Sequence, residues 1–122
     1  MEIFPVGRVI DNESGRAEIE VLPEYQDGLY RIEESEELLV LYIFNRMDEV
    51  RMRVHPKGDP RNPLVGVFAS RSPMRPNHIA ATVVKFISVN GNILTVEGMD
   101  ALDGSPVIDI KPAKRRDDAN AL

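Results

Sequence analysis

The sequence predicts an all-β protein, built as a small closed or strongly curved antiparallel β-barrel. About eight short segments have strand-like patterns, no segment has a convincing long helical pattern, and Gly, Pro, Asn and Asp mark frequent turns. Closure of the sheet would remove the exposed edges that otherwise pair with other chains. We expect one domain over residues 1–112 and a flexible tail over residues 113–122.

The N-terminal half contains four of the expected strands. Residues 3–10 form the first, ended by a turn at Asp11–Gly15. Arg16–Leu22 alternates apolar and acidic residues, as a half-buried strand does. Leu38–Asn45 is apolar on both faces, which is typical of a central strand, and Val50–Val54 alternates apolar residues with arginine. The acidic segment between the second and third strands could form a helical turn.

The C-terminal half contains the other four strands. His55–Pro63, with three prolines and a glycine, predicts the loop that precedes them. Asn90-Gly91 predicts a two-residue hairpin turn of the primed type, and Pro112 predicts the end of the last strand. We expect these strands at residues 64–70, 78–89, 92–99 and 105–112.

Several classes of protein are excluded by composition. The chain has no cysteine, so it has no disulfide framework and no thiolate metal site. Its two histidines do not have the spacing of a zinc site, and we expect no metal. The start has no signal-peptide pattern and no apolar run approaches 18 residues, so we expect a cytoplasmic protein without a membrane span.

Charge is distributed unevenly along the chain. The net charge is −5, but residues 46–78 carry seven bases against three acids, whereas residues 1–45 carry three bases against eleven acids. This basic island (residues 46–78) is either a mixed solvated surface or the surface that meets an anionic partner. The two-sided apolar strands at Leu38–Phe44 and Ile79–Val89 also predict self-association, which we expect to give a homodimer.

A proline-stiffened loop, Arg71–Asn77, separates two strand-like segments. Pro73 and Pro76 restrict its backbone, so little ordering entropy remains to be lost on binding. Its arginines could clamp an anion or a planar ring, or they could cap backbone carbonyls in a rigid connection. His78, at the entrance of the next strand, is more often structural than catalytic in such a position.

A second dense segment, Gly98–Ala113, holds three carboxylates within ten residues. Asp100, Asp103 and Asp109 do not have the spacing of a calcium loop. They either cap turns, as Asp103-Gly104 suggests, or provide a carboxylate that binds a ribose hydroxyl or an ammonium group.

These two segments together resemble the TsaA-like (YaeB-like) family. The resemblance rests on "GVFASRSPMRPNHIAAT" and "DALDGSPVIDIKPA", with "PVGRVI" and "LLVLYIFNR" in the matching order. It covers about residues 4–112 and implies a small β-barrel, usually a homodimer, that binds S-adenosylmethionine. Characterised members of the family methylate a transfer RNA (tRNA), at the exocyclic nitrogen of threonylcarbamoyladenosine beside the anticodon.

The resemblance also implies site residues. Cofactor contacts are expected at Asn45, Arg46, Arg71, Ala81, Gly98, Met99, Asp100, Asp103 and Gly104. Arg75 and Asn77 match the family's Arg-Pro-Asn and are expected to shape the pocket or meet RNA, while Arg51 and Arg53 in the basic island are expected to contact RNA phosphates. The catalytic base, if one is used, is unknown, and Asp100, Asp103 and His78 are its unranked candidates.

One departure from the family pattern leaves alternatives open. Bacterial members have a Pro-Arg-Gln loop soon after the first strand, whereas this chain has only "DNESGR" at residues 11–16. The chain could therefore be a non-catalytic ligand- or RNA-binding module of the same fold, or a methyltransferase with a different small or RNA substrate.

Overall fold

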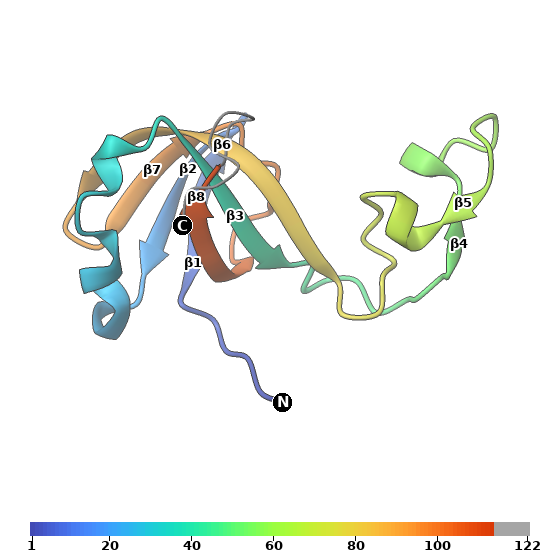
Figure 1. The fold of residues 1–122 in the computed structure, drawn as a ribbon, viewed down its shortest axis with the longest axis horizontal. Coiled ribbons are helices and arrows are strands. Elements are labelled where there is room, and N and C mark those ends of the chain that lie inside the picture. Colours follow the sequence, from blue (N-terminus) through green and yellow to red (C-terminus); the bar gives the residue numbers. More distant parts are fainter. Residues whose placement is uncertain (114–122) are drawn as a thin grey trace, which may run out of the picture. The chain divides into compact units, whose positions relative to one another are not determined.

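A computed structural model describes residues 1–113, and its regular structure is mainly β (Figure 1). This confirms the all-β class. The strands are β1 (Gly7–Glu13), β2 (Arg16–Val21), β3 (Glu37–Ile43), β4 (Arg53–Val54), β5 (Val65–Gly66), β6 (Ile79–Asn90), β7 (Ile93–Glu97) and β8 (Pro106–Pro112). Short 3-10 helices lie at η1 (Pro23–Leu29), η2 (Ile32–Glu34), η3 (Pro56–Gly58) and η4 (Val67–Ala69). The predicted tail, from residue 114 onward, lies outside the described residues.

Six strands hydrogen bond in the order β1-β2-β7-β6-β3-β8, and β8 pairs back with β1 (Figure 1). The β1–β2, β2–β7, β6–β7, β3–β8 and β1–β8 pairs are antiparallel. Gly7 lies opposite both Val21 of β2 and Val107 of β8, so β1, at one end of the strand order, pairs with β8, at the other end. The strand order is therefore closed. No helix within residues 1–113 combines the length and apolarity needed to span a membrane.

Contacts divide the chain into two compact units, the sheet unit (residues 1–42 and, among described residues, 81–113) and the insert unit (residues 43–80). The sheet unit holds the six-stranded sheet, and the insert unit holds the small antiparallel β4–β5 pair. The single domain expected over residues 1–112 stays a prediction.

The core of the sheet unit follows the period-two pattern of its strands. Ala17, Ile19 and Val21 of β2 are buried, as their alternation with glutamates predicts. In β3 the residues alternate between buried and half-buried, so the strand keeps a second apolar face that the unit covers only in part. Fully buried aliphatic side chains, which fill the core, are Val9, Ile19, Leu38, Val40, Val84, Leu94, Val96 and Val107.

Two expected strands are much shorter than predicted. Of Val50–Val54 only Arg53–Val54 is a strand, and of residues 64–70 only Val65–Gly66 is, followed by η4. The alternation of apolar residues with arginine predicted a buried face for Val50–Val54. In the insert unit, however, Val54 and Val67 are buried while the neighbouring apolar side chains Val50, Met52, Leu64 and Phe68 are exposed.

Two turns differ from their expected positions. β1 runs on to Glu13, with a bulge at Ile10, so the first turn is Ser14–Gly15 and not Asp11–Gly15. Asn90 pairs with Ile93, which places the second two-residue turn at Gly91–Asn92, one residue later than expected. Gly91 has a φ of 60°, as a primed hairpin turn requires.

Candidate functional site

The loop between β7 and β8 carries five of the residues expected at the cofactor site, and the β1–β2 hairpin holds its backbone. Asn12 donates its side-chain amide to Met99 O at 3.2 Å and to Ala101 O at 2.7 Å. The Asn12 carbonyl oxygen accepts from Gly15 N at 3.0 Å. Gly15 O accepts in turn from the backbone nitrogens of Gly98 and Met99, at 2.9 and 3.0 Å. Both carbonyls that flank Asp100 are thus fixed by one side chain.

The side chain of Asp100 is held by two hydroxyl groups from neighbouring strands. Tyr42 of β3 donates its hydroxyl to Asp100 Oδ1 at 2.6 Å, and Thr82 of β6 donates its own to the same oxygen at 2.7 Å. The two hydroxyl oxygens lie 3.2 Å apart. Each hydroxyl has one proton. When both protons are donated to the Asp100 carboxylate, neither is available for a hydrogen bond between the two hydroxyl groups.

The Tyr42 hydroxyl is a permanent hydrogen-bond donor in this cluster. Its side chain is 2% exposed, and burial raises the pKa of Tyr42 to about 12, with a further contribution from the hydrogen bond to Asp100. The phenol is therefore protonated at neutral pH and does not act as a base. Asp100 itself is exposed, so a buried donor holds an acceptor that solvent and ligands can reach.

Two glycines shape this loop. Gly98 has a φ of 95°, a conformation that favours glycine. A Cβ there would lie 3.7 Å from Val83 O, an ordinary van der Waals contact, so the backbone conformation and not a lack of space explains the glycine. Gly104 has a φ of 87° and donates its backbone N–H to Val9 O at 2.6 Å. This left-handed backbone explains why glycine occupies both positions without any ligand.

Other predicted residues of the sheet unit lie on the same loop, on β6 or on β8. Asp103 is exposed in the loop, and Ala81 is half-buried on β6, next in sequence to Thr82. Asp109 lies within β8 and forms an ion pair with Lys111 at 2.6 Å, so it does not cap a turn. Within residues 1–113, no group of three His, Cys, Asp or Glu side chains is arranged to hold a metal ion.

Arg75 caps backbone carbonyls in the insert unit. Its Nη1 lies 3.0 Å from Ser70 O, 3.2 Å from Ser72 O and 3.4 Å from Val67 O. Of the two roles that the sequence allowed for the arginines of the proline-stiffened loop, Arg75 therefore has the structural one, as a cap of backbone carbonyls. Asn77 lines a small hollow in the same unit, together with Phe68, Arg75, Pro76 and Ile79.

His78 also has structural contacts. Its Nδ1 lies 2.8 Å from Pro73 O, and because a carbonyl only accepts, Nδ1 is the protonated ring nitrogen. Its backbone has a φ of 51°, a left-handed conformation that costs a non-glycine residue about 1 kcal/mol. His78 O accepts from Phe44 N at 2.9 Å, and these contacts favour the structural role that the sequence suggested.

The remaining predicted residues lie in the insert unit. Asn45, Arg46 and Arg71 are exposed, as are the guanidinium-bearing side chains of Arg51 and Arg53. Arg51 is not on a strand, and its Nε forms an ion pair with Glu49 at 2.6 Å. The expected cofactor residues thus fall into two groups, one in each unit.

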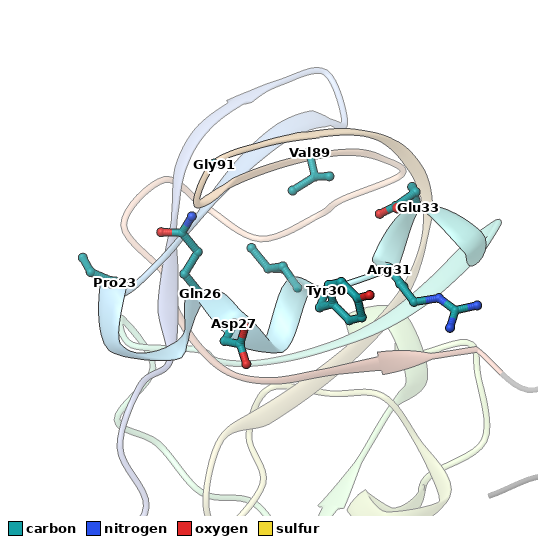
Figure 2. Close-up of a pocket in the computed structure, with 9 residues that line it drawn as sticks. Pro23, Gln26, Asp27, Tyr30, Arg31, Glu33, Val89 and Gly91 are labelled. Carbon is teal, nitrogen blue, oxygen red and sulfur yellow. The ribbon is translucent and has the colours of Figure 1, made fainter.

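A shallow hollow in the sheet unit carries none of the predicted residues (Figure 2). It is lined by residues of η1, η2 and the β6–β7 hairpin. Tyr30 and Arg31 are among the lining residues (Figure 2). Arg31 is ion-paired with Glu34 at 2.7 Å.

Comparison with known proteins gives the chain a family. The sequence model described as the tRNA-methyltransferase O N-terminal domain matches residues 7–119. The chain belongs to this family. It aligns over its full length with the crystal structure of TrmO from Pseudomonas aeruginosa, with a TM-score of 0.73 and 27% identity, and spans 58% of that chain. The TsaA-like family resemblance is thereby confirmed.

Two relatives from Archaeoglobus fulgidus match the tRNA-methyltransferase O N-terminal domain of this chain over 95 residues, 78% of its length. One is named an S-adenosyl-L-methionine-binding protein and is 46% identical, with 67% of its length covered. The other is 50% identical, and the chain spans 25% of its length.

Sequence reasoning missed Asn12, Tyr42 and Thr82 in this member of the family. Asn12 lay in a segment that predicted only a turn, and Thr82 lay within an apolar strand. Tyr42 gave a signal that could have been used. It shares the inward face of β3 with Leu38 and Val40, and a buried tyrosine hydroxyl needs a hydrogen-bond partner.

Proposed function

We propose that this chain is an S-adenosylmethionine-dependent methyltransferase that acts in the cytoplasm on the exocyclic nitrogen of threonylcarbamoyladenosine beside the tRNA anticodon. Membership of the tRNA-methyltransferase O N-terminal domain family supports this reaction, and the name of the Archaeoglobus relative supports the cofactor. The closed strand order supports the small β-barrel expected for the sheet unit. The half-buried outer face of β3 supports a homodimer.

The Asp100 cluster is the observation that carries the proposal. S-adenosylmethionine has an α-ammonium group and ribose hydroxyls, both of which donate hydrogen bonds. The cluster presents an exposed carboxylate whose Oδ1 is already fixed by Tyr42 and Thr82. An acceptor held in one orientation fits such a donor, because little side-chain entropy is lost when the donor binds.

Methyl transfer requires this chain mainly to position the two reacting groups. When bound, S-adenosylmethionine supplies a methyl group on a sulfonium, whose sulfur departs as a neutral thioether. The residues then need to hold the nucleophilic nitrogen in line with the methyl carbon. Asp100, Asp103 and His78 remain candidates for accepting the proton of that nitrogen. In His78 only Nε2 can do so, because Nδ1 donates to Pro73 O.

The other proposed cofactor contacts are the ones that the resemblance implies. In the sheet unit they are Ala81, Gly98, Met99, Asp103 and Gly104, and in the insert unit Asn45, Arg46 and Arg71. Asn45, Arg46 and Arg71 are exposed.

The basic island is the proposed tRNA surface. Arg51 and Arg53 are exposed and are proposed to neutralise phosphates, although Glu49 offsets part of the charge of Arg51. Asn77 is exposed and remains a proposed RNA or pocket contact. Arg75 is proposed to shape the loop, because its guanidinium is engaged with carbonyl oxygens.

A non-catalytic S-adenosylmethionine-binding module is the second candidate. The Archaeoglobus relative is named for binding and not for transfer, which favours it. The chain also spans 58% of the TrmO chain from Pseudomonas aeruginosa.

Transfer of labelled methyl from S-adenosylmethionine to tRNA separates the two candidates. The substrate is tRNA that carries threonylcarbamoyladenosine, and the matched control is the same tRNA without the modification. The proposal predicts label in the modified tRNA alone. Cofactor binding without transfer would favour the binding module.

A further inference from the structure

We infer that Tyr42 and Thr82 are positioning residues of the cofactor site, which orient the Asp100 carboxylate so that its Oδ2 meets a hydrogen-bond donor of the cofactor. This inference rests on the proposed function and adds to it two residues that lie outside the cofactor contacts implied by the resemblance.

The hydrogen bonds at Asp100 are asymmetric. Both hydroxyl groups donate to Oδ1, at 2.6 and 2.7 Å, which uses the two lone pairs of that oxygen. Among residues 1–113, every side-chain hydrogen bond at Asp100 goes to Oδ1. The fixed Oδ1 thereby sets the direction of Oδ2, which keeps its acceptor capacity.

The two donors come from neighbouring strands of the sheet unit. Tyr42 is 2% exposed in β3, and Thr82 is half-buried in β6, a neighbouring strand of the closed order. The loop that carries Asp100 is fixed independently by Asn12, through Met99 O and Ala101 O. Backbone and side chain of Asp100 are therefore each held by a separate part of the sheet.

Stability explains only part of this arrangement: the buried Tyr42 hydroxyl needs one partner, whereas Asp100 Oδ1 also accepts from Thr82. An exposed carboxylate is well solvated, and holding it in one orientation contributes little to folding. A preoriented acceptor contributes to binding, because the ordering cost is met before the ligand arrives. The ligand group it suits is a donor, which is the α-ammonium or the ribose hydroxyl pair of the cofactor.

A double-mutant cycle tests whether Tyr42 acts through Asp100. Tyr42→Phe, Asp100→Asn and the double variant are titrated calorimetrically with S-adenosylmethionine, and Tyr30→Phe serves as a control because Tyr30 is an 81% exposed tyrosine of the same unit. We expect Tyr42→Phe to raise the dissociation constant roughly tenfold. In the Asp100→Asn background the same change should have less than about a twofold effect. An equal effect in both backgrounds, or none in the first, would overturn the inference.

Conservative replacement tests Thr82 in the same titration. Thr82→Ser keeps the hydroxyl and should bind within about twofold of the unmodified protein, whereas Thr82→Val should bind roughly tenfold more weakly. Equal affinity of the two variants would show that the hydroxyl has no positioning role.

Two analogues identify the donor group. S-adenosylhomocysteine keeps the ammonium and the ribose, whereas 5′-methylthioadenosine keeps only the ribose. If Asp100→Asn weakens binding of both, the donor is the ribose; if it weakens only the former, the donor is the ammonium. No loss with either analogue or with the cofactor would overturn the role of Asp100.

Failure of the proposed function is recognised separately. If the unmodified protein does not bind S-adenosylmethionine, the proposed function fails, and amide hydrogen exchange still tests the positioning. Tyr42→Phe should then accelerate exchange in residues 99–104, while Tyr30→Phe should not. Unchanged exchange in both variants would overturn the positioning role as well.

Discussion

Asn12 donates its side-chain amide to Ala101 O at 2.7 Å, across 89 positions of sequence. This contact ties the end of β1 to the loop that carries Asp100. It lies in the short "DNESGR" segment, where sequence reasoning found no equivalent of the cofactor-holding loop of bacterial relatives. In this chain the segment therefore holds the backbone of that loop through the half-buried side-chain amide of Asn12.

Asn12→Ala should lower both stability and cofactor affinity. It removes hydrogen bonds to Met99 O, Ala101 O and Gly15 N, and we expect a loss of about 1–3 kcal/mol in the free energy of unfolding. Urea denaturation measures the first effect and calorimetry the second. Asn92→Ala is the matched control, since Asn92 donates to Val21 O at 2.9 Å away from this loop. If both variants lose affinity equally, the Asn12 contact has no specific role.

Tyr42 should make stability depend on pH in the alkaline range. Its pKa is raised to about 12 in the folded state, so folding holds the phenol proton more tightly than the unfolded chain does. This stabilisation is fully present below the ordinary pKa of about 10 and is lost as pH rises towards 12. Denaturation midpoints between pH 9 and about 12 should fall more steeply for the unmodified protein than for Tyr42→Phe. Parallel midpoints would show that Tyr42 does not contribute.

Arg71 and Arg75 should respond differently to alanine substitution. Arg75→Ala removes a cap from three carbonyl oxygens and should lower the melting temperature. Arg71→Ala should leave the melting temperature unchanged and weaken S-adenosylmethionine binding by about 1.5–3 kcal/mol, as loss of a charge-assisted contact does. Unchanged affinity in Arg71→Ala would remove this residue from the proposed site.

tRNA binding should depend on salt through the basic island. Each phosphate contact adds about one unit to the slope of log affinity against log salt. The double variant Arg51→Ser, Arg53→Ser should reduce that slope by between one and two units, since Glu49 already offsets part of the charge of Arg51. It should leave S-adenosylmethionine affinity unchanged. Arg8→Ser, Arg16→Ser, in the acidic N-terminal third, is the control, and a slope near zero in the unmodified protein would exclude the RNA surface.

The protein should be a homodimer. Leu39 and Leu41 on the outer face of β3 are half-buried, and Val83 on the neighbouring β6 is 49% exposed. Such an apolar face is stabilised by a second copy. Sedimentation equilibrium at micromolar concentration should show twice the chain mass of 13.7 kDa. A single species of 13.7 kDa would refute the prediction.

Period-two patterns predicted the strands of the sheet unit well. Ala17, Ile19 and Val21 are buried as their alternation requires, and β6 and β8 follow their expected ranges closely. The same pattern failed at Val50–Val54, because alternation reports a buried face only where a core is available, and in the insert unit Val54 alone of that segment is buried.

The candidate site was predictable in part. Asp100 stood out among the carboxylates of Gly98–Ala113, and its place at the cofactor site, like that of Gly98, was what the family resemblance implied. Tyr42, Thr82 and Asn12 meet Asp100 and its neighbours only through long-range strand pairing, between 18 and 89 positions apart. Local patterns do not specify such contacts, so these residues emerged only from the folded sheet.

Nucleoside mass spectrometry of tRNA tests the proposed methyl transfer most directly. We compare a strain that lacks this gene with strains that carry the unmodified gene or the Asp100→Asn variant. Loss of the gene should remove methylated threonylcarbamoyladenosine and leave the unmethylated nucleoside, the unmodified gene should restore the methyl group, and the variant should restore less of it. An unchanged nucleoside profile in the deletion strain would contradict transfer to this nucleoside.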